Sequence, residues 1–330
     1  MKKLIFLFIG ILVLAGCGQN LFAPKPENVP ISSDPAEASA LGEEALDNGD
    51  YSLAKKAFEQ IINTSSDTEA VKDAKKNMFM TLTAENEVTP VDIVLKSGII
   101  DAMSSMGDSS DSSGADTSAT GKIADKLLDE TLLTSMSSTF NKDGALNYID
   151  NVTGIDKAET ISVGDTISLD LKLTDGAAAK ITVDTDGNLL VNGAKITAQT
   201  ADSFGLTDPT AAANAGMTHM MNTFAVVIDK DKNGAIDSGE KNTLDSLKTA
   251  ANTGDFDSGM QDTFEDTKVK ENAMQELVMA KVQMELAVAT MDTDGDSKAD
   301  DPSTAGTYDM IKGMNDALSG IFSSFSDNGE

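Results

Sequence analysis

The feature that most constrains this chain is the stretch of residues 229–240, which reads DKDKNGAIDSGE. Side chains that carry oxygen occupy every second position in its first half, at Asp229, Asp231 and Asn233, and Gly234 follows them. Glycine adopts the positive φ of a sharp turn without the penalty that a Cβ imposes. Helical patterns flank the stretch on both sides. It is therefore predicted to be a tight, acidic loop that joins two helices.

The stretch resembles the twelve-residue calcium loop of the EF-hand family. The resemblance covers residues 210–251, which include the flanking helices, and not the rest of the chain. It implies a calcium ion held by Asp229, Asp231, Asn233, the backbone carbonyl of Ala235, Asp237 and Glu240. Glu240 is long enough to bind through both carboxylate oxygens. The alternative is an acidic loop that caps a helix, although such a loop would match fewer of these positions by chance.

Residues 292–303 contain a second, less complete version of this pattern, similar to an EF-hand or dockerin-like loop. The calcium ligands that the resemblance implies are Asp292, Asp294, Asp296, the backbone carbonyl of Lys298, and Asp300. Ser297 replaces the turn glycine, and Ser303 replaces the final carboxylate. Loss of the bidentate ligand predicts weaker calcium binding. A solvated acidic turn before the next helix is the alternative.

The two loops begin 63 residues apart, counted from Asp229 to Asp292. A compact EF-hand pair is closer in sequence. The loops therefore either pair through an extended connection within residues 244–264 or sit separately on one helical body.

The first residues of the chain resemble the processing signal of bacterial lipoproteins. Lys2 and Lys3 precede an apolar run at residues 4–14 that is too short to span a bilayer, and residues 14–17 read LAGC. The resemblance implies that residues 1–16 are a signal peptide and that Cys17 carries a lipid. Residues 17–36 would then be a tether at the bacterial cell envelope, on the outer membrane or on the outer face of a single membrane. An ordinary signal peptide with a stray cysteine is the alternative.

Composition narrows the function further. The formal charge is −29 and the sequence contains no arginine, so the surface repels phosphate backbones and nucleic acid is not expected as a partner. Because Cys17 is the sole cysteine, the mature fold has no disulfide, thiolate zinc site or cysteine nucleophile. The sole histidine, His219, is predicted to be a packed or half-exposed helix residue and not a catalytic one.

The fold is predicted to be mainly α, with a small antiparallel β-meander inserted. Within the helical region 37–106, the small residues Gly42 and Ala54 and the larger Leu41 and Phe58 resemble the seam of one tetratricopeptide hairpin, although any two-helix hairpin would look similar. The further segments are a disordered linker at 107–120, a helical segment at 121–155, the β-meander at 156–200, and an EF-hand-like helical domain at 205–326.

Periodicity predicts individual helices at residues 68–83, 90–106, 122–140, 209–227, 238–251, from 257 or 258 to 291, and at 304–325. The long helix that ends at residue 291 is apolar nearly all round from Leu277, which predicts a central place in the core. Residues 184–188 are interpreted as a hairpin turn and not as half of a calcium loop. The many methionines are interpreted as core filler, with a groove for a partner helix as the alternative.

Three functions remain open from the sequence. The first is a calcium-stabilised, lipid-anchored scaffold, not an enzyme, that presents a helical surface to another envelope protein. The second is a calcium-supported hydrolase of envelope polymers that works through paired carboxylates. The third is a passive acidic surface protein that binds cations.

Replacing Cys17 with Ala is expected to move most of the protein from the membrane fraction to the soluble fraction, because the lipid attaches to that sulfur. Immunoblotting of the two fractions measures the shift. Undiminished membrane retention of the variant would contradict a lipid anchor at this residue.

Overall fold

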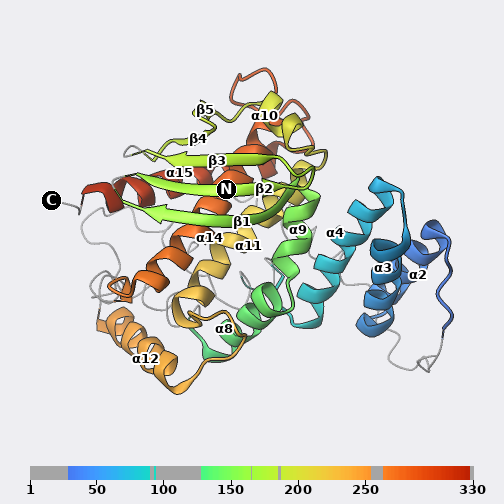
Figure 1. The fold of residues 1–330 in the computed structure, drawn as a ribbon, viewed down its shortest axis with the longest axis horizontal. Helices are drawn as coiled ribbons and strands as arrows, with labels where there is room; N and C mark the ends of the chain where they lie inside the picture. Colours follow the sequence, from blue (N-terminus) through green and yellow to red (C-terminus); the bar gives the residue numbers. More distant parts are fainter. Residues whose placement is uncertain are drawn as a thin grey trace, which may run out of the picture. The chain divides into compact units, whose positions relative to one another are not determined.

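The computed structural model describes residues 29–89, 93, 128–164, 166–184, 187–253 and 263–327. The described chain is mostly helical with one small antiparallel sheet, which confirms the predicted fold class at that level (Figure 1). The chain divides into two compact units, residues 1–85 and 86–330, which are treated separately below. No helix among the described residues has both the length and the apolar character needed to span a bilayer.

Several predictions fall outside the described residues. They are the signal peptide, Cys17 and most of the tether, almost all of the helix expected at 90–106, the linker at 107–120, and residues 254–262.

The described part of the first unit, from residue 29 on, contains three helices: α2 (Pro35–Asp47), α3 (Tyr51–Thr64) and α4 (Thr68–Glu85). Asp34 and Asp50 accept backbone N–H groups at the starts of α2 and α3, which satisfies donors that the helix leaves unpaired. Gly42 of α2 is buried against the ring of Phe58 in α3, and a Cβ on Gly42 would lie 2.6 Å from that ring. The predicted close approach of these two helices is therefore present.

Among its described residues, the second unit contains the helices α8 (Glu130–Ser137), the π-helix η1 (Ser138–Lys142), α9 (Ala145–Val152), α10 (Ala198–Ser203), α11 (Pro209–Ile228), α12 (Ser238–Thr253), α14 (Thr267–Met291) and α15 (Ala305–Asp327). Two predicted helices are not continuous. The one expected at 122–140 is broken at residues 128 and 129, after which Asp129 caps α8, and the one expected from residue 257 or 258 is broken at residues 264–266, after which Asp266 caps α14. The parts of these predictions at 122–127 and 257–262 lie outside the described residues.

The sheet is a five-stranded meander in the order β1-β2-β3-β4-β5, with every neighbouring pair antiparallel. Its strands are β1 (Ile155–Val163), β2 (Ile167–Leu173), β3 (Ala178–Val183), β4 (Leu189–Val191) and β5 (Ala194–Lys195). Between β3 and β4, the Gly187 N–H donates to the Asp184 carbonyl at 3.0 Å. The interpretation of residues 184–188 as a turn is therefore confirmed.

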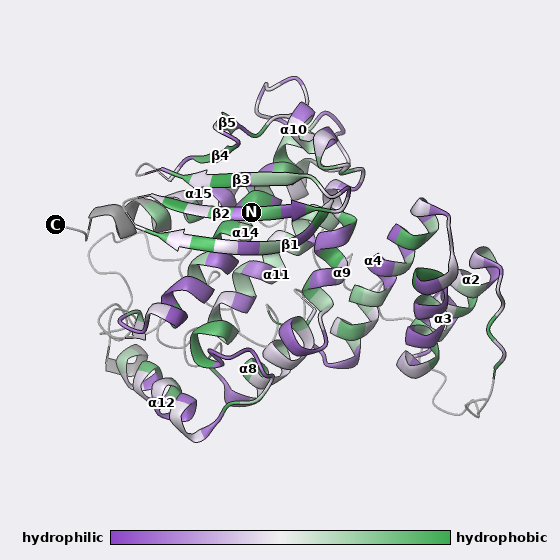
Figure 2. Cartoon of the chain, viewed as in Figure 1, coloured by the Kyte–Doolittle hydropathy of each residue, from purple (hydrophilic) through white to green (hydrophobic). Residues whose placement is uncertain are grey.

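One face of the sheet packs on the helices. Apolar and polar residues alternate along the strands (Figure 2), and the buried side chains Leu169 and Ile181 pair across β2 and β3. This face shares one apolar core with α11, α14 and α15 (Figure 1). Every residue of α14 from Leu277 to Met284 is buried, which confirms its predicted central place.

Helices α11 and α14 run antiparallel in direct contact. Gly216 in α11 lies against Met284, so that a Cβ on Gly216 would stand 2.7 Å from the Met284 Cγ. Just after the last residue of α11, the Lys230 carbonyl accepts a hydrogen bond from the Asn272 amide, near the start of α14, at 2.8 Å. Methionines fill much of this core, and the buried ones include Met221, Met274, Met279, Met284 and Met291. Their burial supports the core-filling interpretation.

The junction between α9 and β1 depends on Gly154, which has a φ of +90° and whose missing Cβ would stand 1.6 Å from the Phe204 carbonyl oxygen. Gly154→Ala is expected to lower the free energy of unfolding by more than about 3 kcal/mol, because it adds a steric clash to the strain of the positive φ. Urea denaturation followed by far-ultraviolet circular dichroism measures the loss.

Gly176 provides the matched control, since its φ is +87° but its Cβ would meet nothing within 4 Å. Gly176→Ala should therefore cost only about 1–2 kcal/mol, the strain alone. Equal losses for the two variants would mean that the contact with Phe204 is not tight in solution.

Candidate metal centre

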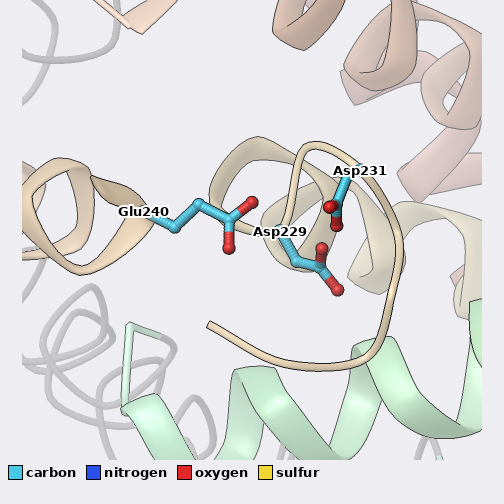
Figure 3. A group of neighbouring side chains, drawn as sticks. All are labelled: Asp229, Asp231 and Glu240. Carbon is cyan, nitrogen blue, oxygen red and sulfur yellow. The ribbon is translucent and has the colours of Figure 1, made fainter. Parts of the chain in front are cut away.

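The loop of residues 229–240, called loop 1 below, joins the end of α11 to the start of α12. It brings together the carboxylates of Asp229, Asp231 and Glu240, whose oxygens lie within 4.8 Å of one another (Figure 3). Asp229 is 1% exposed and Glu240 is 4% exposed, whereas Asp231 is at the surface. Three carboxylates this close repel one another strongly unless a cation or protons lie between them.

Hydrogen bonds from the backbone hold these carboxylates in place. Asp229 accepts the N–H groups of Asn233 at 3.2 Å and Gly234 at 2.8 Å. Glu240 accepts the N–H groups of Lys230 at 3.1 Å and of Asp237 at 3.0 Å, so its side chain closes the loop. The positive φ predicted for Gly234 is present, at +82°.

A neighbouring element that the sequence did not predict supports loop 1. The Ser137 hydroxyl, at the end of α8, donates to the Asp229 carboxylate. The π-helix η1 follows, and a Cβ on Gly234 would stand 3.0 Å from both the Ser138 Cα and the Lys142 Cδ. A π-helical turn is wider than an α-helical turn and is frequent at functional sites. Here it gives the tip of loop 1 a surface to pack on.

Burial raises the pKa of Glu240, and the neighbouring charges of Asp229 and Asp237 act in the same direction. A hydrogen bond shared with the Asp229 side chain, and the hydrogen bonds that the Asn233 N–H and amide donate, lower the pKa of Asp231. Loop 1 therefore contains one carboxylate that holds its proton more tightly than usual beside one that gives it up more easily. A cation at this place would relieve the repulsion that Glu240 experiences.

Of the other predicted ligands of loop 1, Asp237 does not belong to this carboxylate group, and the side chains of Asp237 and Asn233 both accept local hydrogen bonds. Asp237 accepts the N–H groups of Gly239 at 2.7 Å and Glu240 at 2.9 Å, as a residue that starts a helix does. The Asn233 side chain accepts the Ala235 N–H at 2.8 Å.

The second loop, residues 292–303 or loop 2 below, connects α14 to α15 and gathers the carboxylates of Asp292, Asp294 and Asp300 within 4.8 Å. Its backbone matches that of loop 1 at equivalent positions. The fourth residue has a positive φ in both loops (Lys232 at +57°, Gly295 at +76°), and so does the sixth (Gly234 at +82°, Ser297 at +66°). The serine at the glycine position has therefore not changed the turn.

The two loops also share their hydrogen bonds. In each, the first aspartate accepts the N–H of the sixth residue and the third residue accepts the N–H of the fifth. The N–H of the second residue reaches Glu240 in loop 1 but Asp300 in loop 2, where Thr293 donates at 3.0 Å. Asp300 thus closes loop 2 from the ninth position, in the role that Glu240 has at the twelfth.

The remaining predicted residues of loop 2 lie outside its carboxylate group. Asp296 accepts the N–H of Lys298 at 3.0 Å, which repeats the bond from Ala235 to Asn233 in loop 1. The Lys298 side chain lies within 3.8 Å of the Asp296 carboxylate at the surface.

The two loops lie at opposite ends of the antiparallel α11–α14 pair, because loop 1 follows α11 and loop 2 follows α14. With a rise of about 1.5 Å per residue, the stretch of α14 from Asn272, which contacts loop 1, to Met291, which precedes loop 2, spans about 30 Å. The eighth residues of the loops accordingly pack in different clusters, Ile236 with Val227 and Leu244, and Ala299 with the sheet core. The separate arrangement is therefore the one adopted.

Sequence reasoning missed a buried ionic cluster close to loop 1. His219, in α11 and 4% exposed, has its Nδ1 2.7 Å from the Glu276 carboxylate of α14 and its Nε2 3.0 Å from the Asp150 carboxylate of α9. Gln283 donates to Asp150 at 2.9 Å, and Lys232 of loop 1 donates to Glu276 at 3.2 Å. His219 is packed, which is one of the two placements that the sequence predicted. Its two partners left no sequence signal, since they lie 57 and 69 residues away.

The cluster lies beside a cavity of about 230 Å³, lined by Asp150, His219, Glu276, Lys157, Lys232 and Gln275 among others. Burial lowers the pKa of His219, but the carboxylates of Asp150 and Glu276 outweigh this effect and raise the pKa to about 10. Burial raises the pKa of Glu276, whereas Lys232 and His219 bring it down to about 2. At neutral pH, His219 is therefore already protonated and too weak an acid, and Glu276 is already ionised and too weak a base, for efficient proton transfer.

No protein-family model, curated protein or solved structure matches this chain. A function for this chain can therefore be inferred only from the geometry and chemistry of its own residues.

The raised pKa of His219 predicts a pH dependence of folding. The imidazolium contributes to the free energy of unfolding fully below pH 6.5, and this contribution disappears as the pH rises to about 10. The contribution of Glu276 is present above pH 4.5 and disappears as the pH falls to about 2. In urea denaturation, His219→Gln should therefore lower the free energy of unfolding by about 3–5 kcal/mol between pH 4.5 and pH 6.5, where both contributions are present. The loss should be smaller at alkaline pH. A cost that stays constant up to pH 10 would mean that the ring is neutral.

Proposed function

We propose that this protein is a calcium-binding, lipid-anchored lipoprotein of the bacterial cell envelope that serves as a structural or protein-interaction scaffold. In this proposal loop 1 is an EF-hand-like calcium loop, and the lipid on Cys17 holds the protein at the membrane. The membrane anchor rests on the sequence of residues 1–17 alone.

The convergence of Asp229, Asp231 and Glu240 is the observation that carries the proposal. All three are hard oxygen ligands, which suit Ca²⁺ or Mg²⁺ and do not suit soft metals. Asn233, the Ala235 carbonyl and Asp237 stand in the same loop and would complete the larger coordination number that calcium prefers. A solvated acidic loop has no need to bury two carboxylates together, so the burial of Asp229 and Glu240 favours the cation.

The ion would act as a structural clamp. Asp229 ends α11 and Glu240 lies in the first turn of α12, so one cation bound by both would fix the two helices relative to each other. Calcium-binding modules outside the cell have dissociation constants of about 10⁻⁴ to 10⁻³ M. In that range the loop would be steadily filled and would not respond to brief signals.

Loop 2 is proposed as a second, weaker cation site. The exchange of Ser303 for the final carboxylate would cost one bidentate ligand, and Asp300 would supply a carboxylate in its place. The aspartate is shorter and its group is exposed, which favours weaker binding than at loop 1.

The scaffold role is favoured over the two alternatives on separate grounds. A hydrolase with paired carboxylates needs one that keeps its proton at working pH, and Glu276, which lines the cavity beside Asp150, has a lowered pKa. A passive cation-binding surface needs no ordered repeat-like helices. The described helices of the first unit are ordered, and the close contact of Gly42 with Phe58 supports a tetratricopeptide-like surface for another envelope protein.

Glu240→Gln tests the calcium site directly. The neutral amide removes a charged ligand, so calorimetry should find the affinity for calcium sharply reduced at loop 1. At a calcium concentration about a hundredfold above the dissociation constant, bound ion adds about 2.7 kcal/mol, or about 5–10 °C in melting temperature. The variant should lose that increment in calcium and melt almost like the wild type in chelator.

Glu44→Gln, on an exposed position of α2 in the first unit, makes the same change of charge at a residue that belongs to neither loop and should leave the calcium increment unchanged. Identical melting curves of wild type and Glu240→Gln in calcium would exclude loop 1 as the site.

A further inference from the structure

Lys232 occupies an unusual place in loop 1. It lies between Asp231 and Asn233, and its φ of +57° is a conformation that few residues other than glycine adopt. The equivalent residue of loop 2 is Gly295, which adopts the same region without strain. Loop 1 therefore holds a lysine where the backbone favours glycine, and some other interaction has to offset that strain.

The side chain of Lys232 provides that interaction. Its Nζ lies 3.2 Å from the Glu276 Oε1, and Glu276 is 95% buried at its side chain. The other oxygen of the same carboxylate contacts His219, which in turn contacts Asp150. A continuous chain of charged contacts therefore runs from the middle of loop 1 to α9, through α14 and α11.

Breaking a buried pair leaves a charge without its partner, which costs much more than breaking a surface pair. Lys232 thus has a strong preference for the one position that satisfies Glu276, and this preference fixes the first half of loop 1, where Asp229 and Asp231 lie. Nearby, the Asn272 amide of α14 donates to the Lys230 carbonyl, which fixes the loop at a second point.

We infer that Lys232 and Glu276 are positioning residues of the calcium site, and that their ion pair couples calcium binding in loop 1 to the buried cluster of Asp150, His219 and Glu276. The inference rests on the calcium site proposed above. Loop 2 has no charged side chain at its fourth position, where Gly295 stands, so the coupling is a property of loop 1.

A double-mutant cycle in the full chain, with calcium affinity measured by calorimetry, tests the coupling. Glu276→Gln should weaken calcium binding about tenfold, because it frees the Lys232 ammonium near the ion and loosens the loop. In the Lys232→Met background, which keeps the length of the side chain and the strain of its backbone, Glu276→Gln should change the affinity by less than about twofold. Equal factors in the two backgrounds would overturn the inference.

The chain contains a matched control pair. Lys230 is also a loop 1 lysine, and its Nζ lies 3.4 Å from the Asp266 carboxylate at the start of α14, with both side chains nearly half exposed. The cycle of Lys230→Met with Asp266→Asn makes the same changes of charge at an exposed pair, so its coupling should stay below about twofold. A coupling as large as that of Lys232 and Glu276 would show a general charge effect and overturn the specific role.

His219 gives a second readout, which does not depend on folding of Glu276→Gln. Because the chain contains one histidine, selective labelling gives a single set of imidazole signals in nuclear magnetic resonance. Coupling is reciprocal, so saturation with calcium should shift these signals in the wild type and leave them nearly unmoved in Lys232→Met.

The outcomes separate the two proposals. Calcium binding in the wild type without a shift of the His219 signals overturns only the coupling. Absence of calcium binding in the wild type overturns both the coupling and the proposed calcium site.

Discussion

The contact between α11 and α14 is the interaction on which the second unit depends. The two helices approach closely because Gly216 has no side chain, and their antiparallel course places His219 beside Glu276. The same contact sets the positions of the two acidic loops, since each helix ends in one of them. The sheet completes the arrangement by covering the apolar faces of these helices with its own buried face.

The buried carboxylates of the second unit have two different kinds of partner. In the buried cluster, Asp150 and Glu276 are neutralised within the protein by His219 and Lys232, so the cluster is balanced without any ligand. In loop 1, Asp229 and Glu240 are buried just as deeply, yet backbone N–H groups and the Ser137 hydroxyl are their main partners. Hydrogen bonds of this kind offset part of the desolvation, and a divalent cation would supply the missing charge.

The two loops also illustrate how a backbone conformation tolerates different sequences. The turn at the sixth position forms with Gly234 in one loop and with Ser297 in the other, and the closing carboxylate comes from Glu240 in one and Asp300 in the other. By its position in the motif, Ser303 is a lost ligand, because it stands where the final carboxylate is expected. The structure offers a different residue for the same hydrogen bond, because Asp300 needs only to reach the second N–H of its own short loop.

The sequence by itself determined the local features of this protein: the mainly helical class, the meander with its turn at residues 184–188, the central helix after Leu277, and the two acidic loops. Each of these follows from side-chain periodicity or from turn residues close together in the chain. Only the tertiary structure decided that the loops lie at opposite ends of one helix pair, that the π-helix supports loop 1, and that His219 lies between two buried carboxylates. Those contacts join residues far apart in sequence, and they depend on how helices pack, which periodicity does not encode.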